Sequence, residues 1–286
     1  MNTGPSLLKI VLFCWVFCWA APQFAPAFGE QPSVPPPFGQ DPPWFLAQVD
    51  LPQGLNPPPR KAPVVVAIVD DAIRTSHRLL DPFIWRNPGE RVNGVDDDGN
   101  GVTDDIQGWD VSDADNDVNP PPGKEETYYH GTHLAGIIAQ MAQMAYGEKA
   151  PEQLRIMPVK VLSDWAENTY LKDSYGGLKY ALDAGADIIL CAWNEADLKP
   201  ELRALLQEAE KRSVIIVGSA GNYPEEKEQF PAAFPAVIAV AGSHVSGAKM
   251  AGSNYGSFVD MVAPGEEVSS SGATSDTAYR ERTGTS

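Results

Sequence analysis

Three residues whose side chains can together hydrolyse an acyl bond are spread along this sequence. Asp70 ends an apolar run, His130 begins a His-Gly-Thr-His segment, and Ser286 ends the Gly-Thr-Ser segment that closes the chain. A carboxylate, an imidazole and a hydroxyl of this kind are the members of a nucleophilic triad. Asn222, in Ser-Ala-Gly-Asn, adds an amide that can donate a hydrogen bond. Taken singly, Asp70 or Asn222 can equally be a cap or turn residue.

Buried strands and helices alternate between these residues and determine where their side chains can meet. Continuous apolar runs rich in β-branched residues predict strands at residues 64–69, 156–162, 187–191, 214–217 and 237–241. Apolar residues at helical spacing predict helices at residues 131–146, 178–184 and 199–212. The alternation predicts an α/β fold with a mostly parallel central sheet and helices on both faces. Asp70 and Asn222 each follow a predicted strand, at the edge where such sheets bind ligands.

The order of these motifs resembles that of the subtilisin-like serine proteases, the subtilase family. Asp before His before Ser is the order of the subtilisin triad, whereas chymotrypsin and the α/β-hydrolases use other orders. The resemblance extends over residues 63–286. The motifs that carry it are Asp-Asp-Ala at 70–72, His-Gly-Thr-His-Leu-Ala-Gly at 130–136, Ala-Gly-Asn at 220–222, Ser-Asn-Tyr-Gly at 253–256, Ala-Pro-Gly at 263–265 and Gly-Thr-Ser at 284–286.

The resemblance implies a serine endopeptidase that hydrolyses peptide bonds of a protein or peptide substrate. In such an enzyme Asp70 would orient His130 and stabilise its imidazolium. His130 would take the proton of Ser286 and later deliver it to the leaving amine. The amide of Asn222 would donate to the oxyanion of the tetrahedral intermediate.

The family resemblance also predicts that the C-terminal part of the domain is missing from this sequence. In the family, Met-Ala and a long buried helix follow the catalytic Ser. A chain ending at Ser286 would place a free carboxylate where negative charge develops, and we expect it to be poorly active. The alternative is a non-catalytic, calcium-stabilised, secreted binding module on a decayed fold of this family. Ala72, Ala192 and Asn194 stand where the family usually has other residues and favour that alternative.

An acidic segment between Asp70 and His130 resembles a calcium-binding loop. Positions one, three, five and nine of such a loop are matched by Asp96, Asp98, Asn100 and Asp104. The bidentate Glu of position twelve is missing, and Asp105 is a candidate replacement. We therefore predict a structural Ca²⁺ bound by these five residues, with a solvated acidic loop as the alternative.

Charge and the N-terminal sequence limit the partners and the compartment. The chain has a formal net charge of −17, which argues against nucleic-acid binding because phosphate contacts need Lys and Arg. Residues 1–27 resemble a secretory signal peptide, with Lys9, an apolar stretch and an Ala-Pro-Ala site. The apolar stretch is shorter than the ~20 residues of a membrane-spanning helix. We expect a secreted or extracytoplasmic protein without stable membrane insertion after signal cleavage.

The remaining sequence divides into two parts. Prolines crowd residues 28–62, which we predict to be a spacer because proline favours extended backbone and forbids long helices. Residues 63–286 would then form the peptidase domain. Cys191 is the one cysteine outside the signal segment, so no intramolecular disulfide is expected after cleavage.

Overall fold

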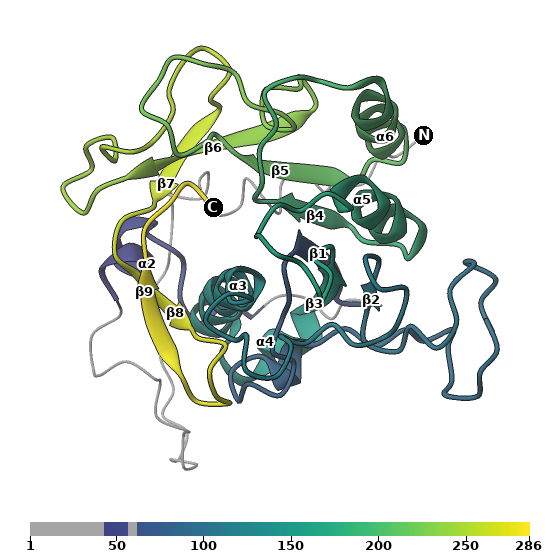
Figure 1. Cartoon of the computed structure of the whole chain (residues 1–286). Coiled ribbons are helices and arrows are strands. Elements are labelled where there is room, and N and C mark those ends of the chain that lie inside the picture. Colours follow the sequence, from purple (N-terminus) through teal and green to yellow (C-terminus); the bar gives the residue numbers. More distant parts are fainter. Residues whose placement is uncertain (1–42, 57–61) are drawn as a thin grey trace, which may run out of the picture.

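The computed structural model describes residues 43–56 and 62–286, with a parallel sheet at the centre (Figure 1). Its seven strands follow the order β2-β3-β1-β4-β5-β6-β7, and every neighbouring pair is parallel. The predicted α/β fold is therefore confirmed, and the five predicted strands correspond to five of the seven. The strands are β1 (Val64–Asp70), β2 (Trp109–Asp110), β3 (Leu154–Lys160), β4 (Ile188–Cys191), β5 (Ile215–Ser219), β6 (Val237–Ser243) and β7 (Met261–Pro264).

Helices cover both faces of the sheet because the central strands are apolar on both faces. Successive residues of a strand point to opposite sides. Val69 packs in one core with residues of α5 (Ser174–Asp183) and α6 (Pro200–Lys211). Ile68 packs in a second core with residues of α3 (His130–Tyr146) and α4 (Ala150–Gln153). Figure 1 shows these two pairs of helices on opposite sides of the sheet.

A polar hairpin and a short helix pack against the side of α3 that faces away from the sheet. The hairpin consists of β8 (Val268–Ser271) and β9 (Tyr279–Arg282), which are antiparallel. Gly136 of α3 permits the close contact, because a Cβ there would lie 2.2 Å from the hydroxyl oxygen of Ser271. The hairpin completes the packing around the helix that begins at His130.

The short helix α2 (Trp44–Gln48) belongs to the stretch that the sequence predicts to be a spacer. Phe45 and Leu46 are buried and pack with Ile137, Met141 and Val268. This part of the proline-rich stretch is therefore packed against the domain. The predicted signal segment, residues 1–27, lies outside the described residues. Among the described helices, none has both the length and the apolar composition needed to cross a membrane.

Candidate active site

Asp70 and His130 are hydrogen-bonded to each other at the carboxyl-terminal edge of the sheet. Asp70 is the last residue of β1, and His130 is the first residue of α3. Nδ1 of His130 lies 2.8 Å and 2.9 Å from the two carboxylate oxygens of Asp70. The carboxylate is buried, whereas a third of the His130 side chain is exposed. The pair thus has a buried orienting acid and an imidazole that faces a cavity.

The electrostatic surroundings of His130 favour its charged form. Burial opposes the imidazolium, but the charge of Asp70, its hydrogen bond and the charge of Asp71 outweigh burial and raise the pKa of His130. His133, one helical turn further, behaves in the opposite way. Burial lowers the pKa of His133 to about 4, and its Nε2 lies 3.1 Å from the carbonyl oxygens of Val268 and Arg280. His133 therefore joins α3 to the hairpin and is not a member of the pair.

Two small residues let α3 approach the end of β1. A Cβ on Gly131 would lie 2.6 Å from the carbonyl oxygen of Ala72, so this position has room for glycine alone. Ala72 itself is buried and has no positive φ. The turn after Asp70 therefore does not require the glycine that the family usually has there.

The amide of Asn222 is oriented by Thr285, which we did not single out from the sequence. Asn222 follows β5, and its Oδ1 accepts hydrogen bonds from the N–H of Thr285 at 2.8 Å and from its hydroxyl at 3.0 Å. The hydroxyl oxygen of Thr285 also accepts from the N–H of Gly221 at 3.2 Å. Within the described part of the chain, Nδ2 of Asn222 has no hydrogen-bond partner, so this N–H group can donate to an anion.

Ser286, His130 and Asn222 line one cavity of about 330 Å³. The hydroxyl of Ser286 donates to the carbonyl oxygen of Ala192 at 3.3 Å. No hydrogen bond joins Ser286 to His130 among the described residues. Catalytic hydrogen bonds are often long or misaligned before substrate binds. The fold thus brings the three predicted residues to one cavity, with the hydroxyl turned toward the end of β4.

A second cavity of about 550 Å³ is also lined by Asn222. Asn194 contributes to its wall and bonds to the end of β5, since its Nδ2 donates to the carbonyl oxygen of Ser219 at 2.6 Å. The side chain of Asn194 thus fixes two neighbouring strand ends. Polar and charged residues dominate the rest of the wall: Tyr223, Glu225, Lys227 and Gln229.

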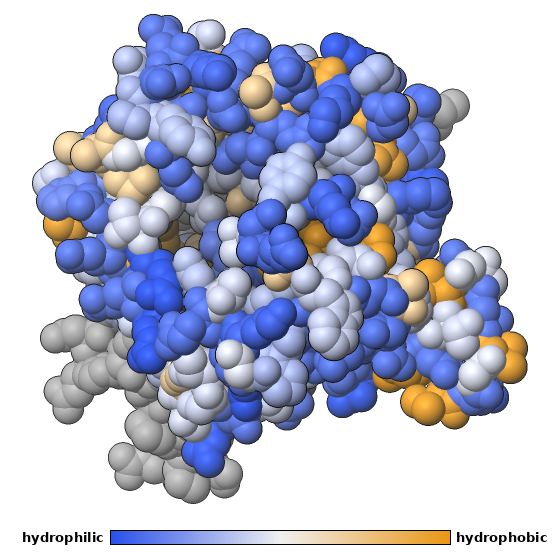
Figure 2. All heavy atoms as spheres, viewed as in Figure 1, coloured by the Kyte–Doolittle hydropathy of each residue, from blue (hydrophilic) through white to orange (hydrophobic). Residues whose placement is uncertain are grey.

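The acidic loop, residues 86–105, projects from the domain beside β2 (Figure 1). Oxygens of Glu90, Asp98 and Asp105 all lie within 4.8 Å of one another. Asp98 and Asp105 belong to the predicted calcium set, and Asn100 donates to both. Glu90 was not identified from the sequence, because it lies before Asp96, where the calcium-loop motif begins. Figure 2 shows the hydrophilic cover of this face and apolar groups on the projecting loop, where Val92 and Val95 are exposed.

The other two predicted ligands point elsewhere. Asp96 accepts from the N–H groups of Gly99 and Gly101, and Asp104 accepts from those of Asn93 and Gly94. These carboxylates stabilise the turns of the loop. Burial raises the pKa of Asp105, although hydrogen bonds from Tyr180, Asn87 and Asn100 oppose this effect. The acidic group of Glu90, Asp98 and Asp105 could hold a cation, because its ligands are hard oxygens.

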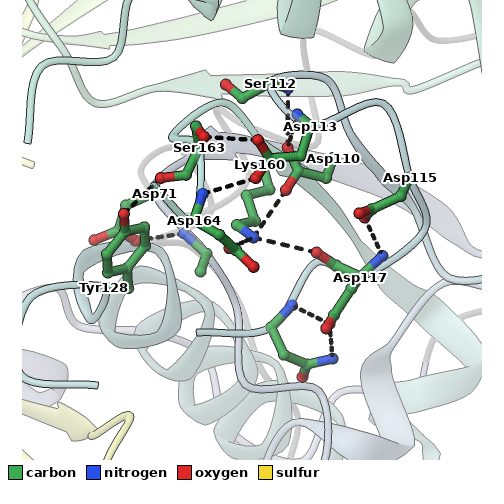
Figure 3. Close-up of polar contacts among 12 residues, drawn as sticks. Asp71, Asp110, Ser112, Asp113, Asp115, Asp117, Tyr128, Lys160, Ser163 and Asp164 are labelled. Atoms are coloured by element: carbon green, nitrogen blue, oxygen red, sulfur yellow. Dashed lines mark hydrogen bonds and ion pairs between the residues drawn. The ribbon is translucent and has the colours of Figure 1, made fainter. Parts of the chain in front are cut away.

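A second acidic group is neutralised by a lysine of the chain (Figure 3). Asp110, Asp113 and Asp164 converge, and Lys160 Nζ lies 2.8 Å from Asp110 Oδ2 and also contacts Asp164. Lys160 is 1% exposed and also donates to the carbonyl oxygen of Asp117. Burial raises the pKa of Asp110 to about 6, although Lys160 opposes the shift. Here the side chain of Lys160 supplies the positive charge.

The chain is similar in sequence to a family of known proteins. The model of the subtilase family, Peptidase_S8, matches residues 61–286. Thermitase from Thermoactinomyces vulgaris is 33% identical over 63% of this chain and 62% of its own length. Halolysin from Haloferax mediterranei is 31% identical over 78% of this chain and 38% of its own length. The major intracellular serine protease of Bacillus subtilis is 30% identical over 78% of this chain and 64% of its own length.

Solved structures show the same fold. A cold adapted subtilisin-like serine proteinase matches with a TM-score of 0.61 at 20% identity, over 85% of this chain and 78% of the other. The protease domain of PatA, in a mutant form, matches with a TM-score of 0.57 at 23% identity, over 78% of this chain and 73% of the other. The chain spans less than two thirds of the length of the three relatives in sequence.

Proposed function

The chain belongs to the subtilase family of serine peptidases, and on that basis we propose that it is a serine endopeptidase with Asp70, His130 and Ser286 as its triad. The observation that supports this assignment is the hydrogen bond between the buried Asp70 and His130, whose imidazole shares a cavity with Ser286. A structural His–Asp pair needs no serine hydroxyl and no oriented amide beside it, and this cavity has both.

In this proposal Ser286 Oγ attacks the carbonyl carbon of a peptide bond while Nε2 of His130 takes its proton. The imidazolium then gives this proton to the departing amine, and an acyl-enzyme forms. Water, deprotonated by His130, hydrolyses the acyl-enzyme and regenerates Ser286. Throughout, Asp70 accepts from Nδ1–H of His130, so that Nε2 is the nitrogen that exchanges protons.

The amide of Asn222 completes the proposal as the donor for the oxyanion. Its Oδ1 is occupied by two hydrogen bonds from Thr285, which aims Nδ2 away from Thr285. A donor that is fixed before the reaction loses little energy in reorganisation when charge develops. The adjoining cavity beside Asn194 and Asn222 would then take a side chain of the substrate next to the scissile bond.

We also propose that the acidic loop binds Ca²⁺ through Glu90, Asp98 and Asp105. The support is the convergence of three carboxylates, two of them buried, whose hydrogen-bond partners within residues 43–56 and 62–286 include no lysine or arginine. Bound Ca²⁺ would offset their mutual repulsion and join residue 90 to residues 98–105. Its role here is structural, and no catalytic step involves it.

Secretion is a further part of the proposal, and it rests on the sequence of residues 1–27. The relatives include both an intracellular protease from Bacillus subtilis and the halolysin-like extracellular serine protease Nep of Natrialba magadii. Mass analysis of the protein from its native source tests this part. Loss of the first 27 or so residues is expected from signal cleavage, and an intact N-terminus would contradict it.

Hydrolysis of casein and of quenched fluorescent peptides by the protein from its native source tests the proposed activity. The Ser286→Ala variant is expected to lose it, while Ser246→Ala, at an exposed serine outside the cavity, keeps it. Absence of hydrolysis by the folded wild-type protein would contradict the proposal and favour the non-catalytic binding module.

A further inference from the structure

Asp71, which follows the orienting Asp70, is buried between β1 and α3, with 4% of its surface exposed. Its Oδ2 accepts a hydrogen bond from the backbone N–H of His130 at 2.9 Å. Its Oδ1 accepts from the N–H of Gly131 at 2.9 Å and from the N–H of Ala72. One carboxylate thus holds the backbone at the start of α3 and the turn after β1.

These contacts replace a cap that α3 does not have in its own sequence. The first N–H groups of a helix have no partner within the helix. Tyr129, the residue before α3, makes no side-chain hydrogen bond to them, and no acidic residue lies in the first turn. Asp71 therefore supplies, from the neighbouring strand, both acceptors and the negative charge that a helix N-terminus favours.

The position of His130 at the very start of α3 makes this cap matter for its imidazole. Asp71 holds the backbone of His130, and Asp70 holds its ring, and the two acids are adjacent in the chain. A shift of the first residue of α3 would change the position of the imidazole relative to both Asp70 and Ser286. Gly131 allows the close approach that these short hydrogen bonds need.

Asp71 also contributes charge at this place. Its titratable neighbours are Asp70 in β1 and His130 in α3. Burial and the charge of Asp70 raise the pKa of Asp71 to about 7, although His130 and the backbone N–H groups oppose the shift. In turn, the negative charge of Asp71 adds to that of Asp70 in favouring the imidazolium of His130.

We propose that Asp71 is a positioning residue, which holds the start of α3 so that the His130 imidazole lies between Asp70 and the nucleophile. This role rests on the proposed function, because it concerns the geometry of the same triad. Asp71 does not touch the substrate in this account. It acts through the backbone of His130.

The test compares Asp71→Asn and Asp71→Ser with Asp187→Asn. Asp187 is a matched control, since its carboxylate accepts from the N–H of Val65 at the other end of β1, at 2.9 Å. For each folded variant we would measure kcat and KM, the dependence of kcat/KM on pH, and the NMR titration of His130. The NMR signal would be assigned with a His130→Gln variant.

In the Asp71 variants we expect kcat to fall by up to about a hundredfold with little change in KM, because misplacement by ~1 Å can cost that much. The pKa of His130 should fall by about one unit when the nearby negative charge is removed. The acid limb of the kcat/KM profile should shift to lower pH as the pKa of His130 falls. Asp187→Asn should leave kcat and the pKa of His130 unchanged, even if it lowers the thermal stability of the protein.

An unchanged kcat together with an unmoved His130 titration in folded Asp71→Asn would overturn the proposal. Equal effects in Asp71→Asn and Asp187→Asn would also overturn it, because they would indicate a merely structural role. The NMR titration separates this inference from the proposed function. If the wild-type protein hydrolyses no peptide, the proposed function fails, whereas a shifted His130 titration still supports the contact between Asp71 and His130.

Discussion

Thr285 donates two hydrogen bonds to Oδ1 of Asn222, from its backbone N–H at 2.8 Å and from its hydroxyl at 3.0 Å. The two residues are 63 positions apart in sequence, yet Thr285 immediately precedes the proposed nucleophile. The contact therefore couples the orientation of the oxyanion donor to the position of Ser286. The role of Thr285 is thus to orient the amide of Asn222, although Thr285 itself takes no part in the proposed reaction.

Replacing Thr285 by Val removes the hydroxyl donor and keeps the backbone donor and the shape of the side chain. We expect kcat to fall by about tenfold, less than the ~10² to 10³ expected when an oxyanion donor itself is removed. KM should change little, since the lost contact acts on the transition state. Steady-state kinetics would compare three variants. Thr285→Ser keeps the hydroxyl donor and should lose least, Thr285→Val should lose more, and Asn222→Ala should lose most. Equal activity of Thr285→Val and wild type would contradict the coupling.

The pH dependence of activity should reflect the raised pKa of His130. Its imidazole must be neutral to accept the Ser286 proton, so activity is lost as pH falls through the pKa of His130. Because the charge and hydrogen bond of Asp70 outweigh burial, that pKa lies above 6.5. We expect the acid limb of kcat/KM to have its midpoint above pH 6.5. A midpoint well below pH 6 would contradict the electrostatics described here.

Removing Ca²⁺ should destabilise the protein through its acidic loop. Thermal unfolding in EDTA is expected at a lower temperature than in millimolar Ca²⁺, since a ligand at a hundred times its Kd stabilises by about 2.7 kcal/mol. Glu90→Gln should abolish this difference. Asp97→Asn is the matched control in the same loop, because Asp97 contacts Asn93 and lies outside the group of three carboxylates. Identical melting with and without Ca²⁺ in the wild type would contradict the site.

Lys160→Met should destabilise the fold by about 3–5 kcal/mol, because it leaves the buried carboxylate of Asp110 without its partner. The double variant Lys160→Met, Asp110→Asn should recover part of this loss, since the buried carboxylate of Asp110 is then replaced by a neutral amide. Denaturation by urea gives both free energies of unfolding. A single variant as stable as wild type would show that the lysine is dispensable.

The elements that the sequence predicted well are those with apolar runs. β1, for example, is buried on both faces, and its run of β-branched residues is visible without any partner. The hairpin of β8 and β9 was not predicted, because Val268 is its one buried apolar residue and the other two buried residues are serines. Ser270 and Ser271 are buried and donate to the carbonyl oxygens of His133 and Thr132. Buried serines that satisfy backbone groups give no hydrophobic signal.

The same limit applies to the site. Asp70 and His130 stand in motifs that can be recognised locally, and the structure joins them directly. Asp71, Thr285 and Glu90 act through contacts with backbone or side chains that only folding brings near. Asp71, for instance, is 59 positions from the N–H group of His130 that it accepts from. Asp, Thr and Glu are common at polar positions of any protein, so their residue types alone do not single these three residues out.

The most direct test of the central claim is covalent labelling of the protein by a fluorophosphonate, with the modified residue located by mass spectrometry. A serine hydroxyl reacts with this probe only when a neighbouring base activates it. We predict one label, on Ser286, that is lost in His130→Ala and retained in Ser246→Ala. A folded protein that takes up no label, or takes it up at another serine independently of His130, would contradict the proposed triad.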